Sequence, residues 1–188
     1  AYKVPVTILL SKLDLQDAEA VAEFRAVYEG AGYRVLEVSA KEGRGVEEVR
    51  ELLAGRTTLV SGNSGVGKST LIQTIDPSLD IRTGEISDSH HKGRHTTTFS
   101  TMYSLAEGGA VIDTPGIKGF GLLDIDDAEL WHYFPEMMRV APGCRFYNCT
   151  HTHEPGCAVT EAVKAGEIAW PRYESYLKIL SLIHISEP

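Results

Sequence analysis

The segment Ser61–Thr70 constrains the fold more than any other part of the chain. It reads SGNSGVGKST and contains the pattern G-x-x-x-x-G-K-S. Glycines let a backbone curl until successive N–H groups converge, and such a curl can hold phosphate oxygens. A β-branched run precedes the loop, and an apolar helical pattern opens at Lys68, where a helix N-terminus adds its partial positive charge. The segment therefore predicts a phosphate-binding loop between a strand and a helix.

Residue types within this loop suggest individual roles. We expect Lys68 to reach the β- and γ-phosphates of a nucleotide and Ser69 to offer its hydroxyl to Mg²⁺. The other predicted contacts come from Gly62, Asn63, Ser64, Gly65, Val66, Gly67 and Thr70. A glycine-rich turn without a ligand is the alternative, and the flanking strand and helix patterns argue against it. The loop does not by itself choose between ATP and GTP.

Strand and helix patterns alternate on both sides of the loop. The strand patterns are Val4–Leu10, Tyr33–Val38, Thr57–Ser61, Phe99–Leu105 and Ala110–Ile112. The helical patterns are Asp17–Glu29, Val46–Leu53, a run opening at Lys68, a run from beyond Asp124 to about Met138, and Val159–Leu182. Alternation at this spacing predicts an α/β fold with a parallel sheet.

Composition sets limits on the class of protein. The chain has 188 residues, enough for one domain with a small appendage, and its hydrophobic content of 43% is ordinary for a globular protein. A net charge of −8 argues against a surface that coats nucleic acid generally. No apolar stretch is long enough for a membrane span and no signal peptide is visible, so we expect a cytoplasmic protein. The first residue is not Met and a strand pattern begins almost at once, so we also expect a fragment.

Two short motifs at strand ends point to the base of the nucleotide. Ser11-Lys12-Leu13-Asp14 follows the first strand pattern, and Ser39-Ala40-Lys41 follows the second. The Asp14 carboxylate can accept two hydrogen bonds from the N1–H and N2–H₂ edge of guanine, which adenine cannot supply. Lys12 can lay its aliphatic stem over the base, and backbone N–H groups of Ser39, Ala40 and Lys41 can meet the guanine O6. Either motif alone is commonplace in a loop, but together, beside a phosphate loop, they predict guanine.

A third motif, Asp113-Thr114-Pro115-Gly116, follows the strand pattern at Ala110–Ile112. Asp113 is expected to hold a water on Mg²⁺, and the Gly116 N–H to meet the γ-phosphate. A simple β-turn is the alternative, since these residues suit one. The phosphate loop favours the functional interpretation.

These motifs together resemble a known family. SKLD resembles the N/T-K-x-D box of GTPases, SAK the box that follows it, and DTPG the D-x-x-G box, but here the first two precede the phosphate loop. This order resembles the circularly permuted GTPases of the ribosome small-subunit-dependent type, over about Lys3 to Leu180. The resemblance implies a P-loop GTPase three-layer sandwich, an N-terminal OB-fold that this sequence lacks, and a partner in the small ribosomal subunit and its rRNA. Ser11 stands where the family has Asn or Thr, so we expect a shortened contact and weaker affinity with guanine selectivity retained.

The resemblance also assigns the hydrolytic residues. Ile117 follows the D-x-x-G box and has no hydrogen-bonding group, so the attacking water must be oriented by another residue. GRHTTT at 93–98 matches the family's switch motif, which implies that Thr97, or next Thr96, binds Mg²⁺ and the γ-phosphate and that His95 positions the water. A solvent-exposed loop histidine is the alternative for His95. Slow intrinsic turnover, accelerated by a partner that orders this segment, is expected.

A cluster of cysteine and histidine lies beyond the GTPase motifs. Cys144, Cys149, His151 and Cys157 supply three thiolates and one imidazole, a tetrahedral set that suits Zn²⁺. A buried cysteine cluster or a redox pair is the alternative. The spacing matches the family's zinc motif, and four protein ligands close the site, so we expect a structural zinc.

The domain interpretation is a GTPase domain over 1–138, a helical zinc module over 139–180 and a non-native tail over 181–188. The favoured function is a GTP hydrolase stimulated by the small ribosomal subunit during its late maturation, working as a monomer. One alternative is a guanine-nucleotide switch that docks without hydrolysis, which Ile117 supports. The other is a P-loop ATPase or kinase, which SKLD, SAK and DTPG argue against.

Overall fold

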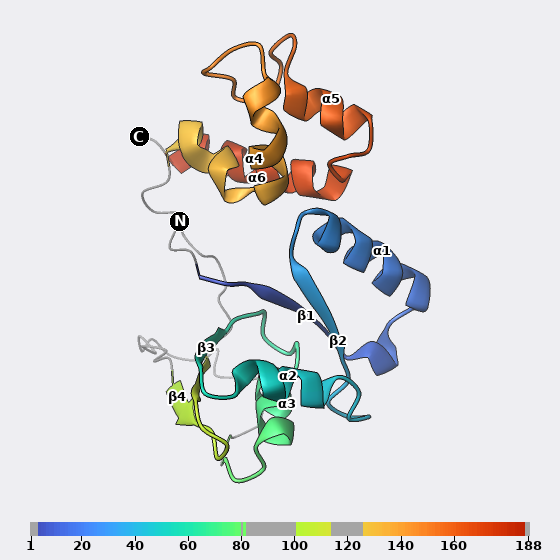
Figure 1. The fold of residues 1–188 in the computed structure, drawn as a ribbon, viewed down its shortest axis with the longest axis vertical. Coiled ribbons are helices and arrows are strands. Elements are labelled where there is room, and N and C mark those ends of the chain that lie inside the picture. The colour runs from blue at the N-terminus through green and yellow to red at the C-terminus, as the bar shows by residue number, and fades with distance from the viewer. Residues whose placement is uncertain (1–3, 80, 82–100, 114–125, 187–188) are drawn as a thin grey trace, which may run out of the picture. The chain divides into compact units, whose positions relative to one another are not determined.

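The computed structural model describes residues 4–79, 81, 101–113 and 126–186 of the chain (Figure 1). These residues form two compact units, each with its own hydrophobic core. One unit comprises Ala1–Ile8, Asp17–Val35 and Gly121–Pro188, and the other comprises Leu9–Gln16 and Leu36–Phe120. Among the described helices, none combines the length and apolarity that crossing a bilayer requires.

The unit that contains the phosphate loop is built on a three-stranded sheet. Its strands are β3 (Thr57–Val60), β4 (Thr101–Ser104) and β5 (Ala110–Asp113), in the order β3-β5-β4. β3 runs parallel to β5, with Val60 opposite Asp113, whereas β4 is antiparallel to β5. The prediction of a parallel sheet is therefore wrong for β4. The turn between β4 and β5 is too short for the crossover that a parallel pair requires.

Helices α2 (Val46–Leu53) and α3 (Lys68–Ile75) contribute to the core of this unit. Val46, Val49 and Leu53 are buried, at the i, i+3 and i+7 spacing of one helix face. Their apolar neighbours are Leu36, Val38, Leu71, Ile72, Ile75, Ile81 and Val111. The predicted bounds of α2 and the predicted start of α3 are confirmed.

Two further strands, β1 (Thr7–Ser11) and β2 (Arg34–Val38), pair in a separate two-stranded sheet. Between them runs α1 (Ala18–Gly30), within one residue of the predicted helix. The Asp17 carboxylate caps its start by accepting hydrogen bonds from the N–H groups of Glu19 and Ala20.

The unit that includes Gly121–Pro188 contains three further helices, α4 (Pro135–Val140), α5 (Ala158–Lys164) and α6 (Trp170–Ser186) (Figure 1). The predicted helix from beyond Asp124 to Met138 is instead a 3-10 helix (Asp127–Tyr133) followed by α4. The break falls at Phe134, which is extended because a residue that precedes proline avoids the helical region. The predicted helical segment Val159–Leu182 is likewise interrupted, and Gly166 at φ +77° follows the end of α5.

An ion pair is buried in this unit. The Arg172 Nε lies 2.6 Å from the Glu136 Oε1, and the two side chains are 13% and 2% exposed. The Arg172 guanidinium lies over the rings of Phe134, Tyr28 and Tyr33, at 4.9, 5.4 and 5.6 Å from their centroids. This arrangement joins α1 and Tyr33, the residue before β2, to α4 and α6.

Candidate nucleotide and metal sites

The phosphate loop connects β3 to α3. Gly65 and Gly67 have φ of +79° and +97°, values that favour glycine, and Gly67 is the residue from which α3 begins. The Lys68 ammonium donates to the Gly62 carbonyl at 2.7 Å and to the Asn63 carbonyl at 3.1 Å. The lysine therefore folds back along the loop, and its charge lies where the loop's own carbonyls converge.

Asp113 lies at the end of β5, opposite Val60 at the end of β3. Burial raises the pKa of its carboxyl, and the nearby positive charge of Lys68 opposes that effect. Its Oδ1 is buried and has no hydrogen-bond partner among the described residues. A buried carboxylate oxygen without a donor fits a residue that holds Mg²⁺ or a water bound to it.

The two base-recognition motifs meet at Asp14. The Ser39 hydroxyl donates to the Asp14 Oδ1 at 3.0 Å, and the Lys41 ammonium lies 3.7 Å from Oδ2. Ser39 is fully buried, and its hydroxyl also accepts the Glu42 N–H at 3.3 Å. Lys41 is 80% exposed, so its ion pair is weak and Ser39 does most to orient the carboxylate. The structure thus brings together residues 25 positions apart.

The first of these motifs is also attached to the phosphate loop. The Ser11 hydroxyl donates to the Val66 carbonyl at 2.7 Å, across 55 positions of sequence. Lys12 has a left-handed backbone at φ 59°, and its Cε lies 3.8 Å from the point that a Cβ on Gly67 would occupy. Although the Ser11 side chain is shorter than the Asn expected at this position, its hydroxyl still reaches the phosphate loop directly.

Four predicted site residues, His95, Thr96, Thr97 and Gly116, lie outside the described residues. The same holds for Ile117. Their roles stay predictions.

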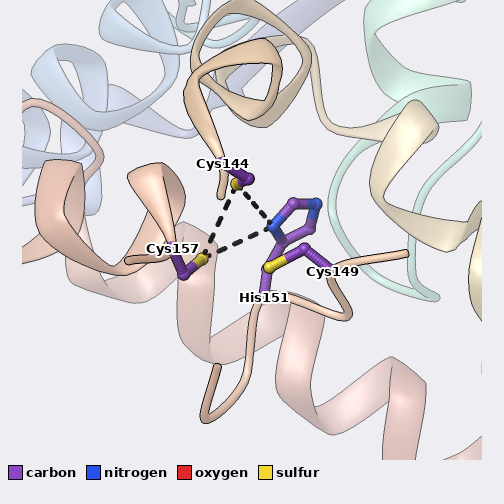
Figure 2. Close-up of side chains that lie close together, drawn as sticks. All are labelled: Cys144, Cys149, His151 and Cys157. Carbon is purple, nitrogen blue, oxygen red and sulfur yellow. Dashed lines mark hydrogen bonds between the residues drawn. The ribbon is translucent and has the colours of Figure 1, made fainter. Parts of the chain in front are cut away.

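The four predicted metal ligands lie together (Figure 2). The Sγ atoms of Cys144, Cys149 and Cys157 and a ring nitrogen of His151 all lie within 4.8 Å of one another. The His151 Nδ1 is 3.6 Å from the Cys144 Sγ and 3.5 Å from the Cys157 Sγ, and those two sulfurs are 4.0 Å apart. Zn–S bonds of about 2.3 Å place tetrahedral sulfur ligands about 3.8 Å apart, so these spacings fit zinc.

The pKa values of the cluster residues also fit a metal site. Burial raises the pKa of Cys149 to about 12, and the neighbouring thiols reinforce that rise, so a cation is needed to hold the Cys149 sulfur as a thiolate. Burial lowers the pKa of His151 and keeps its imidazole neutral, as a metal ligand must be. His153 is not part of the cluster, and its Nδ1 lies 2.8 Å from the Thr152 hydroxyl.

The loop that carries the ligands is braced by residues that sequence reasoning did not assign. Glu154 accepts the N–H groups of Thr150 at 2.8 Å and Thr152 at 3.1 Å, and the Thr150 hydroxyl. Burial acts to raise the pKa of Glu154, but these hydrogen bonds lower it to about 2. Tyr173 and Tyr176, three residues apart on α6, donate their hydroxyls to the His151 and Thr150 carbonyls at 2.7 and 2.6 Å. Two sequence features could have indicated this support: the helical spacing of Tyr173 and Tyr176, and the T-x-T-x-E pattern at Thr150–Glu154.

Comparison with known proteins assigns the family. Residues 1–123, well over half of the chain, match the family model described as RsgA GTPase. The chain belongs to the RsgA GTPase family. Two relatives of this RsgA-family chain are named Small ribosomal subunit biogenesis GTPase RsgA, from Porphyromonas gingivalis, and RsgA 2, from Bacteroides thetaiotaomicron. They are 53% identical over 186 residues and 51% identical over 183 residues, respectively. Each match covers 96% of this chain and 59% of the relative, so the chain spans less than two thirds of the relatives' length.

Solved structures of the family agree with the fold. The crystal structure of YjeQ from Thermotoga maritima matches with a TM-score of 0.82 and 36% identity, over 99% of this chain and 62% of that one. The structure of YloQ, described as a circularly permuted GTPase, matches with a TM-score of 0.73 and 27% identity, over 97% of this chain and 58% of that one. The predicted fold class, a circularly permuted α/β GTPase sandwich with a metal-binding helical module, is confirmed.

Proposed function

We propose that the protein hydrolyses GTP and acts in maturation of the small ribosomal subunit, which stimulates the hydrolysis. The observation that carries the proposal is the Asp14 carboxylate, oriented by Ser39 at 3.0 Å beside a loop to which Ser11 is bonded at 2.7 Å. A carboxylate accepts from the N1–H and N2–H₂ groups of guanine, whereas adenine presents an acceptor at N1. Guanine nucleotides are therefore the preferred ligands.

The phosphate side of the site supports a triphosphate. Backbone N–H groups of Gly62 to Thr70, with the N-terminus of α3, are suited to hold the β- and γ-phosphates. Lys68 offers its ammonium to them, and Ser69 with Asp113 would hold Mg²⁺, which neutralises charge between the phosphates when bound. From the family resemblance, Thr97 or Thr96 completes that ligand set, Gly116 donates to the γ-phosphate, and His95 orients the attacking water.

The partner is proposed from the relatives. Those relatives are named as small ribosomal subunit biogenesis GTPases, and this chain shares about half of its residues with them over 96% of its length. We extend to this protein a role at the small ribosomal subunit and its rRNA, in the cytoplasm and as a monomer. The GTPase domain is assigned to 1–138 and the module with a structural zinc on Cys144, Cys149, His151 and Cys157 to 139–180.

The test is turnover of GTP and of ATP by the zinc-loaded chain, with and without small ribosomal subunits. GTP turnover that rises at least about tenfold on the subunits, with no matching ATP turnover, is expected. Lys68→Ala should abolish the stimulated rate, because the phosphates lose their cation, whereas Lys164→Ala, in an exposed ion pair with Glu161, should leave it unchanged. ATP hydrolysis independent of subunits would refute the proposal, and tight GTP binding without any turnover would favour the non-hydrolysing switch.

A further inference from the structure

The metal ligand His151 lies in a strained turn. Within the described part of the chain, it is one of two residues other than glycine with a left-handed backbone, at φ 59°. An L side chain crowds the backbone in that conformation, so the surroundings must impose it. His151 is 2% exposed and presents its Nδ1 to the sulfurs of Cys144 and Cys157, at 3.6 and 3.5 Å (Figure 2). The single imidazole of the metal cluster therefore depends on a turn that other residues hold.

The imidazole of His151 lacks the support that a metal-bound histidine usually has. Such a histidine donates its second ring N–H to a carboxylate or carbonyl oxygen, and this bond fixes the plane of the ring. The His151 Nε2 is buried and has no hydrogen-bond partner among the described residues. The Trp131 ring lies against the imidazole, with the centroids 5.2 Å apart and the planes at 85°, but it offers no oxygen acceptor. The orientation of the imidazole must therefore come from the backbone of residue 151.

One carboxylate holds the peptide groups on both sides of His151. The Glu154 Oε1 accepts the Thr150 N–H at 2.8 Å and the Thr150 hydroxyl at 2.6 Å. The Glu154 Oε2 accepts the N–H groups of Thr152 at 3.1 Å and His153 at 3.2 Å. The peptide groups that flank His151 cannot rotate out of the left-handed turn without breaking bonds to this one side chain.

Glu154 acts on the loop and not on the metal directly. The four residues whose ligand atoms gather within 4.8 Å of one another do not include it, and its two oxygens already accept donors of the loop. A second hold comes from α6, where the buried Tyr173 hydroxyl donates to the His151 carbonyl at 2.7 Å. Because these bonds fix the peptide groups before and after His151, they fix the direction in which its side chain leaves the backbone.

We propose that Glu154 and Tyr173 are positioning residues of the metal site, which hold the turn at His151 so that its Nδ1 faces the metal. Residues that orient a metal ligand from outside the coordination shell change metal affinity by about 10- to 100-fold when they are replaced. Glutamine at position 154 keeps the size of the side chain but turns one of its two oxygens into an N–H donor, which cannot accept from the loop. The inference rests on the proposed zinc site and is independent of GTP hydrolysis.

The first experiment measures the zinc affinity of the full chain by competition with a chromophoric chelator. Glu154→Gln should bind zinc about 10- to 100-fold more weakly than the unmodified protein. Tyr173→Phe keeps the ring and removes one neutral hydrogen bond, so its zinc affinity should fall by about 2- to 12-fold. Glu161→Gln is the matched control on α5, because Glu161 is 64% exposed and its ion pair with Lys164 is weak, so zinc affinity should stay within about twofold.

The second experiment tests the orientation of the ring in the chain saturated with Cd²⁺, whose magnetic nucleus couples to protons of the ligand ring in NMR spectra. Nδ1 adjoins only the ring carbon that carries Hε1, whereas Nε2 adjoins both ring C–H groups. The unmodified protein should therefore show coupling of the metal to Hε1 of His151 and none to Hδ2. Glu154→Gln should show a weaker coupling to Hε1 or none, a change that a role confined to stability would not produce at saturating metal.

Equal zinc affinity of Glu154→Gln and the unmodified protein would overturn the proposal, as would coupling to Hδ2 or an Hε1 coupling that is undiminished in Glu154→Gln. If circular dichroism shows that Glu154→Gln does not fold in excess zinc, Tyr173→Phe decides, and an unchanged zinc affinity of that variant overturns the proposal. A protein that takes up zinc but fails to hydrolyse GTP would contradict only the proposed hydrolysis. A protein that takes up no zinc would overturn both the zinc site and this proposal.

Discussion

Replacement of Arg172 by alanine should cost about 3–5 kcal/mol of unfolding free energy, the range for leaving one charge of a buried pair without its partner. The Glu136 carboxylate would be that charge, since it is 2% exposed and its Oε1 lies 2.6 Å from the Arg172 Nε. Its Oε2 has no hydrogen-bond partner in the described part of the chain. Burial acts to lower the pKa of Arg172, but the hydrogen bond and charge of Glu136 raise it, so the guanidinium keeps its positive charge.

The size of this effect follows from exposure rather than from distance. Lys164 and Glu161 form a pair of nearly the same length, 2.8 Å, but those side chains are 70% and 64% exposed. Lys164→Ala should therefore cost no more than about 0.5 kcal/mol. For a chain of this length, 3–5 kcal/mol corresponds to a fall in Tm of about 6–20 °C. The three aromatic rings around the guanidinium add to the loss.

The assay is thermal and urea unfolding of the zinc-loaded chain, followed by circular dichroism. Glu136→Gln added to Arg172→Ala should recover at least half of the lost stability, because it removes the unpaired buried charge. A loss for Arg172→Ala as small as that for Lys164→Ala would refute the reasoning. So would a double variant no more stable than Arg172→Ala.

Three further predictions concern other parts of the molecule. Asp14→Asn replaces one carboxylate acceptor by an amide donor, so the affinity for GDP should fall by about 100-fold or more. Xanthosine diphosphate has an oxygen acceptor at position 2 of the base and should bind the variant better than it binds the unmodified protein. Competition against a fluorescent GDP measures both affinities, and an unchanged affinity for GDP would contradict the assignment of Asp14 to the base. Hydrogen bonds from Ser78, then from the Ala106 N–H, lower the pKa of the buried Asp76. The contribution of Asp76 to the free energy of unfolding is thus complete above the unfolded-state pKa of about 4 and is lost as pH falls through the lowered pKa. Asp76→Asn should therefore make the free energy of unfolding in urea depend less on pH between about pH 5 and 2. Plots of that free energy against pH that run parallel for the protein and for Asp76→Asn would contradict this prediction. Cys149→Ser should reduce bound zinc from about one equivalent to less than about a tenth by metal analysis and unfold the ligand loop, whereas full zinc retention would exclude Cys149 as a ligand.

Local signals explain which elements were predictable. The bounds of α2 follow from an apolar period over eight residues, and the start of α3 from glycines followed by a second apolar period. The helix predicted up to Met138 is interrupted at Phe134. The apolar helical period continues through this point of the sequence, but Pro135 keeps the preceding residue out of the helical conformation. The sequence predicts β4 as a strand, but the alternation of strands and helices predicts the wrong direction for it. The short turn at residues 107–109 makes β4 antiparallel to β5.

The sites divide in the same way. Residue type and spacing identified the metal ligands and the loop that contains Lys68, because both chemistries use side chains close in sequence. The bonds Ser39 to Asp14 and Ser11 to Val66 span 25 and 55 positions, so they depend on how strands meet in three dimensions. The contacts of Arg172 with Glu136 and with the rings of Tyr28 and Tyr33 have no local signature in the sequence.

Guanine selectivity of the phosphate-loop site is the central claim, and calorimetric titration of the zinc-loaded chain with GDP and with ADP, both in Mg²⁺, tests it most directly. Two hydrogen bonds to the Asp14 carboxylate, at about 1.5–3 kcal/mol each, should make GDP bind at least about 100-fold more tightly than ADP. Equal affinities, or tighter binding of ADP, would contradict it.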